Sequence, residues 1–345
     1  MLLVKYEHLH NRFSGDSDFD APQKFHNTNI SRIGGVAIFL AILISGFYRV
    51  FFENTGGQEI FLMALASFPA FIAGISEDIS KRAGIKIRLL GTALSALIFG
   101  YIFNSWITNT GLYYLDFLFF APFFSIFFTV FAICGVSNAF NIIDGFNGLA
   151  SFVAVISLIA ISYVGFKVND PLIFITGMVM IGAILGFIFW NYPKGYIFLG
   201  DGGAYLIGFW VACLSVLLVS RNQTVSPMFA LLVNAYPTVE TLFTIWRRKF
   251  HKNKNPGIAD DMHFHSLVYR RVVRWDDQDI GRIVSKSANT RTSPYLWALH
   301  SWAAIPACLF SDLTSVQLGI FILFVFLYIY FFKMIIQFKV PTWIK

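Results

Sequence analysis

The chain reads SNAFNIIDGFNGL from Ser137 to Leu149, a polar segment that interrupts apolar sequence on both sides. It carries one carboxylate, three amides and two glycines, in a chain of 345 residues that is 57% hydrophobic. Ionisable side chains are costly beside hydrocarbon unless they bind something. The segment therefore predicts a site for a polar ligand at the surface of a membrane.

The composition predicts a polytopic membrane protein. With a mean hydropathy of +0.65, 40 phenylalanines and only 13% charged residues, the chain has more apolar side chains than one aqueous core can hide. We expect a single all-α domain over residues 1–345, an integral membrane helical bundle of about ten transmembrane helices. The predicted spans are residues 33–52, 58–75, 89–104, 117–137, 149–166, 172–190, 203–219, 227–246, 296–311 and 316–336.

Lysine and arginine are distributed unevenly between the two sides of this bundle. An even number of spans puts both termini on one side, together with a large loop over residues 247–295. Of the 26 Lys and Arg residues, all lie on that side except Arg49, Lys167 and Arg221. The positive-inside rule makes that side cytoplasmic. The net charge of +7 then indicates attraction to anionic headgroups or substrates, and no nucleic-acid partner is needed to explain it.

Every cluster of carboxylates, amides, glycines and histidines falls on the same side. The clusters are Lys24–His26 with Arg32–Gly35, Glu77–Asp78 with Arg82, Asn138–Gly148, Asn191–Gly203, and Pro256–Ser266. Taken singly, each has an ordinary explanation: a basic residue anchors a span, paired glycines let helices pack closely, an acid caps a helix, and histidines lie on a loop surface. Their coincidence on one face favours a binding site.

These residue types suit a magnesium-dependent reaction on a nucleotide diphosphate. Mg²⁺ takes oxygen ligands from one or two carboxylates and completes its shell with substrate phosphates. Asp78, Asp144 and Asp201, each at a span end, would allow this, while basic side chains and histidines would neutralise the phosphoryl oxygens. We expect Mg²⁺ as the cofactor, with Mn²⁺ as a possible substitute. None of the clusters has the spacing of a P-loop or a dinucleotide-binding motif.

At these residues the chain resembles the polyprenyl-phosphate N-acetylhexosamine-1-phosphate transferase superfamily. Residues Asn138 to Leu149 are similar to its Asn-x-x-Asn-x-x-Asp-Gly-x-Asp-Gly-Leu signature, and Phe198 to Gly203 to its Gly-Asp-x-Gly signature. Glu77-Asp78 matches the family's acidic pair, and Asp260 to His265 resembles its His-x-His-His loop. The resemblance covers most of the chain, and together the motifs are highly specific.

Three substitutions depart from the family's pattern. Glu77 replaces the first acid of the pair, Asn147 the second aspartate of the hinge, and Ser266 a third histidine. They resemble the branch that initiates O-antigen or capsule synthesis. Lys24 and His26 fit the N-acetylglucosamine branch better than the muramoyl-pentapeptide branch, which argues against the peptidoglycan step itself. Most members also carry one more span at the amino terminus; the polar residues that precede Arg32 here have no secretory signal core.

The resemblance implies an enzyme that transfers N-acetylglucosamine 1-phosphate, or a deoxy relative such as N-acetylfucosamine or N-acetylquinovosamine 1-phosphate. The donor would be the UDP-sugar, the acceptor undecaprenyl phosphate and the second product UMP, and the reaction would initiate a lipid-linked surface polysaccharide. It also implies a multi-pass protein of the bacterial inner membrane with its active site facing the cytoplasm, and a homodimer as a possible assembly.

The predicted site residues have different roles. Asp201 is the predicted magnesium ligand. Asp144 is counted with Asp78 and Glu77 among the catalytic residues, and with Asn138 and Asn141 it is predicted to bind the uridine or to help hold the metal. Asp78, beside Glu77, is predicted to orient or deprotonate the attacking lipid phosphate. Substrate binding is predicted for Lys24, Arg82, Asn138, Asn141, Asn147, His263 and His265. Direct attack and a two-step route through an aspartyl or glutamyl phosphate both fit the sequence.

Two other classes of function compete with this interpretation. A transporter or flippase for an anionic glycolipid would use the acids and histidines as coupling-ion sites, but it would place polar residues near the span midpoints and on both faces. The spans are nearly free of charge, with Glu240 the main exception. In the second alternative, the chain is a non-catalytic membrane scaffold, and the substitutions Asn147 and Ser266 indicate lost activity. Against this, three aspartates and two histidines are retained.

Overall fold

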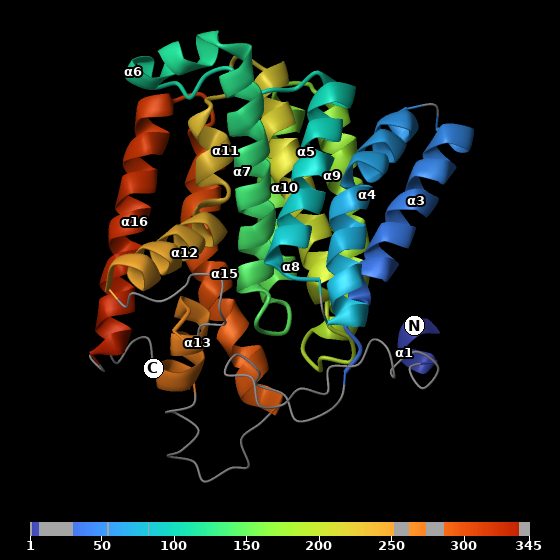
Figure 1. Cartoon of the computed structure of the whole chain (residues 1–345), viewed down its shortest axis with the longest axis vertical. Helices are drawn as coiled ribbons and strands as arrows, with labels where there is room; N and C mark the ends of the chain where they lie inside the picture. The colour runs from blue at the N-terminus through green and yellow to red at the C-terminus, as the bar shows by residue number, and fades with distance from the viewer. Residues whose placement is uncertain are drawn as a thin grey trace.

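The structure, a computed structural model, describes residues 2–6, 30–53, 55–81, 83–251, 262–273 and 286–337. These residues form helices and no β-strand, which confirms the predicted all-α membrane bundle (Figure 1). The helices in chain order are α1 (Leu2–Lys5), α3 (Gly34–Phe52), α4 (Gly57–Ser80), α5 (Ile85–Phe103), α6 (Tyr113–Asp116), the 3₁₀-helix η1 (Phe117–Phe120), α7 (Pro122–Ile143), α8 (Leu149–Lys167), α9 (Pro171–Asn191), α10 (Gly200–Arg221), α11 (Met228–Leu232), α12 (Ala235–Trp246), the π-helix η2 (Arg247–His251), α13 (Phe264–Val268), the π-helix η3 (Tyr269–Val273), α15 (Lys286–Leu309) and α16 (Thr314–Ile336).

Eight of the described helices are long and apolar enough to cross a membrane: α3, α4, α5, α7, α8, α9, α10 and α16. The chain is therefore a multi-pass membrane protein. The two remaining predicted spans look different in the structure. Residues 227–246 are divided between α11 and α12, and residues 296–311 lie in α15, which begins already at Lys286. The number of ten spans stays a prediction.

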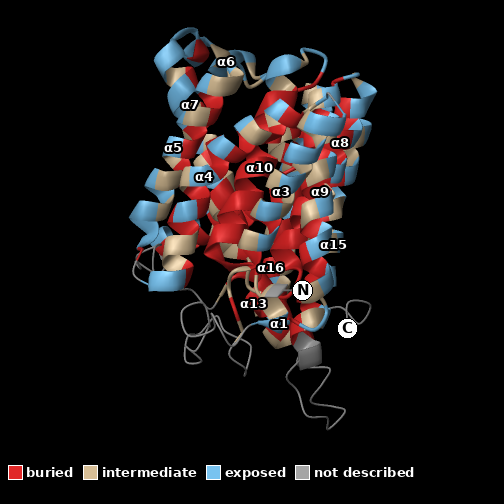
Figure 2. Ribbon diagram, turned by 90° about the vertical axis from the view of Figure 1, so that its right-hand side faces the viewer, coloured by how far each residue is buried: buried red, intermediate tan, exposed pale blue. Residues whose placement is uncertain are grey.

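Helix α10 occupies the centre of the bundle (Figure 2). Every residue from Gly200 to Leu218 is buried, and α10 packs against α3, α4, α7 and α8. A helix that is apolar all round needs protein on every side. The outer helices instead expose large apolar residues, such as Ile44, Phe131 and Phe326, as surfaces in contact with lipid do.

Glycines let α3 and α4 approach the first turn of α10. A Cβ atom on Gly35 would lie 2.4 Å from the Gly203 Cα, and one on Gly74 would lie 2.6 Å from the Gly202 Cα. Both distances are shorter than carbon atoms tolerate, so only glycine fits. Small residues are the usual means by which membrane helices pack backbone against backbone.

A polar side chain provides hydrogen bonds at the break between α11 and α12. Asn234 lies at the break, fully inside the bundle. Its side-chain amide donates to the Ala230 carbonyl at 2.9 Å and to the Ser215 hydroxyl of α10 at 3.1 Å. Backbone groups freed at membrane depth need such partners, which explains why a predicted single span is stable as two pieces.

The bundle has two chemically different ends. We call the end that holds the last turn of α4 and the first turn of α10 the acidic end, because Asp78 and Asp201 lie there. Helix α1 and the end of α16 lie at this end, whereas α6 lies at the opposite end (Figure 1). The 22 residues of α10 span about 33 Å at 1.5 Å per residue, enough to separate the ends by one hydrocarbon layer.

Candidate active site

The Asp78 carboxylate caps the first turn of α10. Its Oδ1 accepts the Asp201 backbone N–H at 2.9 Å and its Oδ2 accepts the Gly202 backbone N–H at 2.8 Å. These N–H groups have no partner inside their own helix, and the positive end of the helix dipole favours a carboxylate there. Asp78 is buried, so it joins α4 to α10 in a water-poor environment.

Gly200 makes this cap possible. Its φ of +75° lies in the left-handed region, and a Cβ atom there would be 2.7 Å from Asp78 Oδ2 and would overlap the Arg32 carbonyl oxygen. Residues next to it form a short backbone pairing, in which the Gly34 and Gly35 N–H groups donate to the carbonyls of Phe198 and Leu199, each at 3.0 Å. The start of α3 is thereby fixed against the start of α10.

Two arginines bind Asp201, one from the segment just before α3 and one from α5. The Arg32 guanidinium donates to Asp201 Oδ1 at 3.1 Å, and its Nε lies 3.8 Å from Asp78. Arg88, in the first turn of α5, forms an ion pair with Asp201 Oδ2 and lies over the ring of Tyr205, 5.9 Å from its centroid. The Tyr205 hydroxyl donates to the Asn138 side chain at 2.8 Å. The acidic end therefore contains alternating anions and cations.

Asp144 lies directly after α7 and completes the group of acids. Among the described residues, no side chain donates a hydrogen bond to its carboxyl group, and the same holds for the Asn141 side chain one turn earlier. Burial of the carboxyl raises the pKa of Asp144 to about 7; Asp201 and Asp78 act in the same direction, while Arg32 opposes them. Asp144 is thus the acid whose oxygens remain available to a ligand.

The hinge after Asp144 is held by two asparagines. The Asn191 side chain accepts the Gly148 N–H at 2.6 Å and donates to the Ile197 carbonyl at 2.8 Å. The Asn147 backbone N–H donates to Asn289 at 3.0 Å, and its side chain reaches the Pro193 carbonyl at 3.4 Å. Asn147, predicted to bind substrate, therefore lies against the turn after α9, where it braces the hinge.

The two predicted loop histidines stack on each other, 5.2 Å apart and nearly parallel. His263 Nδ1 is 3.0 Å from Glu240 Oε1, and the other carboxylate oxygen of this fully buried glutamate accepts the Tyr328 hydroxyl at 2.9 Å. A Cβ atom on Gly145 would lie 3.0 Å from His265 Nε2, so His265 borders the hinge. Glu240 orients His263 through a hydrogen bond to one ring nitrogen, which is how functional histidines are commonly positioned.

The structure thus brings together Asp78, Asp144 and Asp201 with Asn138, Asn141 and His265 at the acidic end. Glu77 is half-buried on the last turn of α4, and one of its carboxylate oxygens is buried without a hydrogen bond among the described residues. Lys24 and Arg82 lie outside the described residues. Sequence reasoning placed the acids at loop positions after or before the spans, whereas α4 runs on to Ser80 and α10 begins at Gly200. The Asp78 carboxylate satisfies the first N–H groups of α10, which lets that helix begin before the predicted span.

Arg88 was missed as a site residue. It stands at the start of an apolar stretch, among other basic residues, so it looks like an ordinary interfacial anchor. Its pairing with Asp201, 113 positions away, depends on how α5 packs in the bundle. No local pattern in the sequence could have revealed it.

The donor set fits a magnesium ion held partly by substrate. Among the described residues, no three or more His, Cys, Asp or Glu side chains are placed to hold a metal on their own. Mg²⁺ does not need such a cage, because it binds through one or two carboxylates plus phosphate oxygens. Asp144 has free oxygens for this role, and Asp201 has oxygens that the two arginines now occupy.

Comparison with known proteins agrees with this geometry. The model of glycosyl transferase family 4 matches residues 60–219, which include most of α4, the hinge and nearly all of α10. A Bacillus subtilis protein, described as a probable undecaprenyl-phosphate N-acetylglucosaminyl 1-phosphate transferase, is 30% identical over 262 residues, covering 73% of this chain and 69% of its own length. The chain belongs to glycosyl transferase family 4.

Other members of the family are similar to the same extent. The undecaprenyl-phosphate alpha-N-acetylglucosaminyl 1-phosphate transferase of Thermotoga maritima is 29% identical over 253 residues, which cover 73% of this chain and 72% of the relative. The phospho-N-acetylmuramoyl-pentapeptide-transferase of Streptococcus pneumoniae is 29% identical over 259 residues, covering 71% and 76%. The family resemblance predicted from the motifs is confirmed, while the choice between these branches stays a prediction.

Proposed function

We propose that this family member transfers an N-acetylhexosamine 1-phosphate from a UDP-sugar to undecaprenyl phosphate and releases UMP. The sugar is N-acetylglucosamine or a deoxy relative, and the product starts a lipid-linked surface polysaccharide such as O-antigen or capsule. The observation that carries the proposal is the meeting of three aspartates with Arg32 and Arg88 at one end of a membrane bundle. Relatives of this chain bear the names of undecaprenyl-phosphate sugar-phosphate transferases.

The proposed step is a phosphoryl transfer. An oxygen of the lipid phosphate attacks the phosphorus that carries the sugar, a new phosphorus–oxygen bond forms, and the bond to the oxygen bridging to the uridine phosphate breaks. UMP leaves with the electron pair. The lipid phosphate is already anionic at neutral pH, so the step needs positioning and charge stabilisation more than a strong base.

Each residue at the acidic end has a part in this step. Arg32 and Arg88 supply positive charge for the phosphoryl oxygens as charge moves to the leaving UMP. Asp144 and Asp201 would hold Mg²⁺, which polarises the phosphoryl group when it is bound. Asp78, whose two oxygens accept backbone N–H groups, keeps Asp201 in place. His265 borders the hinge, where it would bind a donor phosphate.

The orientation follows from charge. In the predicted ten-span topology, all Lys and Arg residues except Arg49, Lys167 and Arg221 fall on the side of the acidic end, which the positive-inside rule assigns to the cytoplasm of a bacterial inner membrane. A water-soluble nucleotide and a membrane-bound phosphate meet naturally there. A transporter would need ionisable groups available along the spans, but the buried carboxylate of Glu240 is already used by His263, the Phe264 N–H and Tyr328.

The test is UMP release by the purified chain in detergent with undecaprenyl phosphate, Mg²⁺ and a panel of UDP-N-acetylhexosamines. Release that requires both lipid and metal, and that falls at least a hundredfold in Asp144→Asn and Asp201→Asn, would support the transferase and name its donor. Folded protein that releases no UMP with any donor would refute the proposal.

A further inference from the structure

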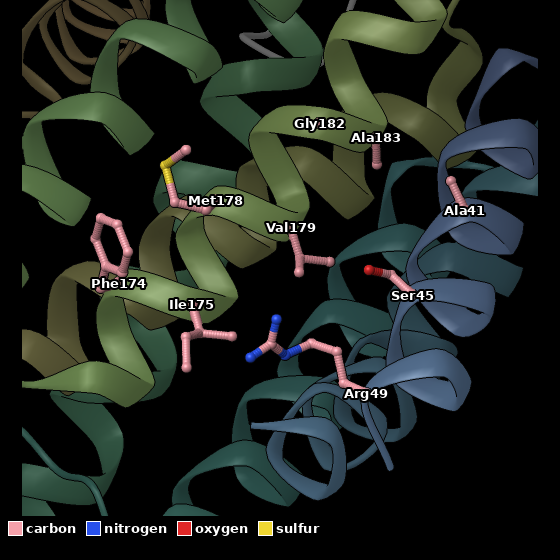
Figure 3. A pocket seen from close by; sticks show the side chains of 9 residues that line it. All are labelled: Ala41, Ser45, Arg49, Phe174, Ile175, Met178, Val179, Gly182 and Ala183. Atoms are coloured by element: carbon pink, nitrogen blue, oxygen red, sulfur yellow. The ribbon is translucent and has the colours of Figure 1, made fainter. Parts of the chain in front are cut away.

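A groove between α3 and α9 lies on the outside of the bundle, away from the acidic end. Its volume is about 450 Å³, and it continues into a second hollow of about 660 Å³ with which it shares Arg49 and Ile175. Both volumes lie within the range of about 300–1,000 Å³ that is typical of small-ligand sites. The α3–α9 groove is lined mainly by Ala41, Ser45 and Arg49 of α3 and by Ile175, Val179 and Gly182 of α9 (Figure 3).

The length of the groove matches one leaflet of a membrane. Ala41 and Arg49 are eight positions apart, which corresponds to about 12 Å along a helix. Half of a hydrocarbon layer is about 15 Å thick. The α3–α9 groove therefore runs from the interface, at Arg49, almost to the middle of the membrane, and it ends well short of the acidic end. Its walls fit the acyl chain of a lipid in the leaflet opposite the proposed reaction.

Arg49 lies at the mouth of this groove. Its side chain extends from α3 across the groove toward Ile175 and Val179 (Figure 3) and is only 18% exposed. The guanidinium donates to the Thr55 carbonyl at 2.9 Å and to the Thr55 hydroxyl at 3.1 Å, and lies 3.4 Å from Glu53. These contacts hold the arginine in place, and a guanidinium is the side chain best suited to bind a phosphate.

The second hollow adds charges of both signs. It is lined by Glu59 and Arg221 as well as by Arg49, and Arg221 forms an ion pair of 2.7 Å with Asp170. Partial burial would raise the pKa of Asp170, but hydrogen bonds from Arg221 and Asn222 lower it below its usual value, so this acid is charged. With carboxylates at least as numerous as guanidinium groups, a purely anionic headgroup gains little here.

We propose that the α3–α9 groove binds a phospholipid whose headgroup carries both a phosphate and a primary ammonium group. The phosphate lies at Arg49, the ammonium donates to Glu59, and an acyl chain follows Ile175 and Val179 toward Gly182. An ammonium with N–H donors can bind a carboxylate directly, which the trimethylated ammonium of a choline headgroup cannot do. The site is independent of the proposed transfer reaction.

The test uses the full chain, purified in detergent and stripped of lipid. Phosphatidylethanolamine, phosphatidylglycerol and phosphatidylcholine are added separately, and bound lipid is counted by native mass spectrometry while thermal unfolding is followed. We expect phosphatidylethanolamine to bind most tightly. Arg49→Gln should weaken that binding about tenfold, because it removes a charge-assisted contact to the phosphate.

A groove-filling variant tests the acyl-chain part. A Cβ atom on Gly182 meets no atom within 4 Å, so Gly182→Leu adds a side chain to the wall of the groove that Gly182 lines and should abolish retention of the lipid. Gly319→Leu is the matched control, since Gly319 also faces open space on α16, at the opposite flank of the bundle (Figure 1). Lys333→Gln controls for loss of one positive charge. Both controls should bind lipid like the parent chain.

Equal binding of the three lipids would overturn the assignment of the headgroup. Retention of phosphatidylethanolamine by Gly182→Leu, or equal losses in Gly182→Leu and Gly319→Leu, would overturn the assignment of the groove. If Gly182→Leu instead converted a dimer to a monomer without a change in lipid binding, the groove would be an interface between two copies of the chain, and the proposal would be wrong.

Discussion

Replacement of Asp78 by asparagine should damage the fold as well as the activity. Both carboxylate oxygens accept backbone N–H groups from the first turn of α10, at 2.9 and 2.8 Å. An asparagine can accept with its single oxygen, but its NH₂ group then faces the second N–H and leaves it without an acceptor. The substitution therefore removes one charge-assisted hydrogen bond and creates one unsatisfied buried donor.

The cost can be estimated from these two contacts. A hydrogen bond to a charged group contributes about 1.5–3 kcal/mol, and an unsatisfied buried donor costs about 1–3 kcal/mol. The favourable interaction of the carboxylate with the helix dipole adds up to about 2 kcal/mol in a partly buried position, while relief of the buried charge offsets part of the loss. We expect a net destabilisation of about 3 kcal/mol and a fall in Tm of roughly 5–10 °C.

The assay compares Asp78→Asn with Asp144→Asn. Thermal unfolding and UMP release are measured on the same detergent-purified samples. Asp144 receives no side-chain hydrogen bond among the described residues and its charged form is disfavoured by burial, so its variant should lose UMP release without any fall in Tm. If Asp78→Asn unfolds at the temperature of the parent yet releases no UMP, Asp78 acts on substrate and not as a cap, and the reasoning above is refuted.

Three further predictions concern other parts of the chain. In EDTA, the free energy of unfolding should fall as pH rises from about 4 to about 7, because native Asp144 keeps its proton with a pKa of about 7 where the unfolded chain has lost it. Measured over this pH range, the free energy of unfolding of Asp144→Asn should depend less steeply on pH, and an equally steep dependence would contradict the assignment. Glu240→Gln should raise the KM for the UDP-sugar several-fold more than it lowers kcat, because the buried carboxylate holds His263; steady-state kinetics measure this, and an effect on kcat alone would contradict it. Gly35→Val should abolish folded yield on size exclusion, since its Cβ would meet backbone at 2.4 Å, whereas Gly84→Val, which meets nothing within 4 Å, should fold normally.

The fold could be predicted because whether a segment crosses the bilayer depends mainly on the residues of that segment. Runs of apolar residues long enough to cross hydrocarbon can be recognised from the sequence alone, and eight of the predicted spans correspond to helices long and apolar enough to cross a membrane. The residues 227–246 show where this logic fails. At the break, the Asn234 side chain bonds the Ala230 carbonyl and the Ser215 hydroxyl of α10, and hydropathy does not register such contacts.

The site could be predicted in part. The acids Asp78, Asp144 and Asp201 were identified because carboxylates at span ends are costly and the motifs around them are specific. Their partners were not, because each pairing joins segments far apart in sequence: Arg88 is 113 positions from Asp201 and Arg32 is 169 positions from it. The sequence favoured Asp78 over Glu77, but only the packing of α4 shows that Asp78 bonds the first turn of α10.

The charges at the acidic end determine how substrate and metal should arrive. Among the described residues, three aspartates face Arg32 and Arg88, and with a pKa of about 7 Asp144 is only partly ionised at neutral pH. The pairs are therefore almost balanced, and a divalent cation alone would have to displace arginines from Asp201 without a new partner for them. A nucleotide diphosphate provides that partner, because its phosphates can bind the guanidinium groups that Mg²⁺ displaces. We expect Mg²⁺ to bind weakly alone and at least tenfold more tightly with UDP present, as measured by calorimetric titration. Equal affinity in both conditions would show that the arginines do not compete with Mg²⁺ for the Asp201 carboxylate.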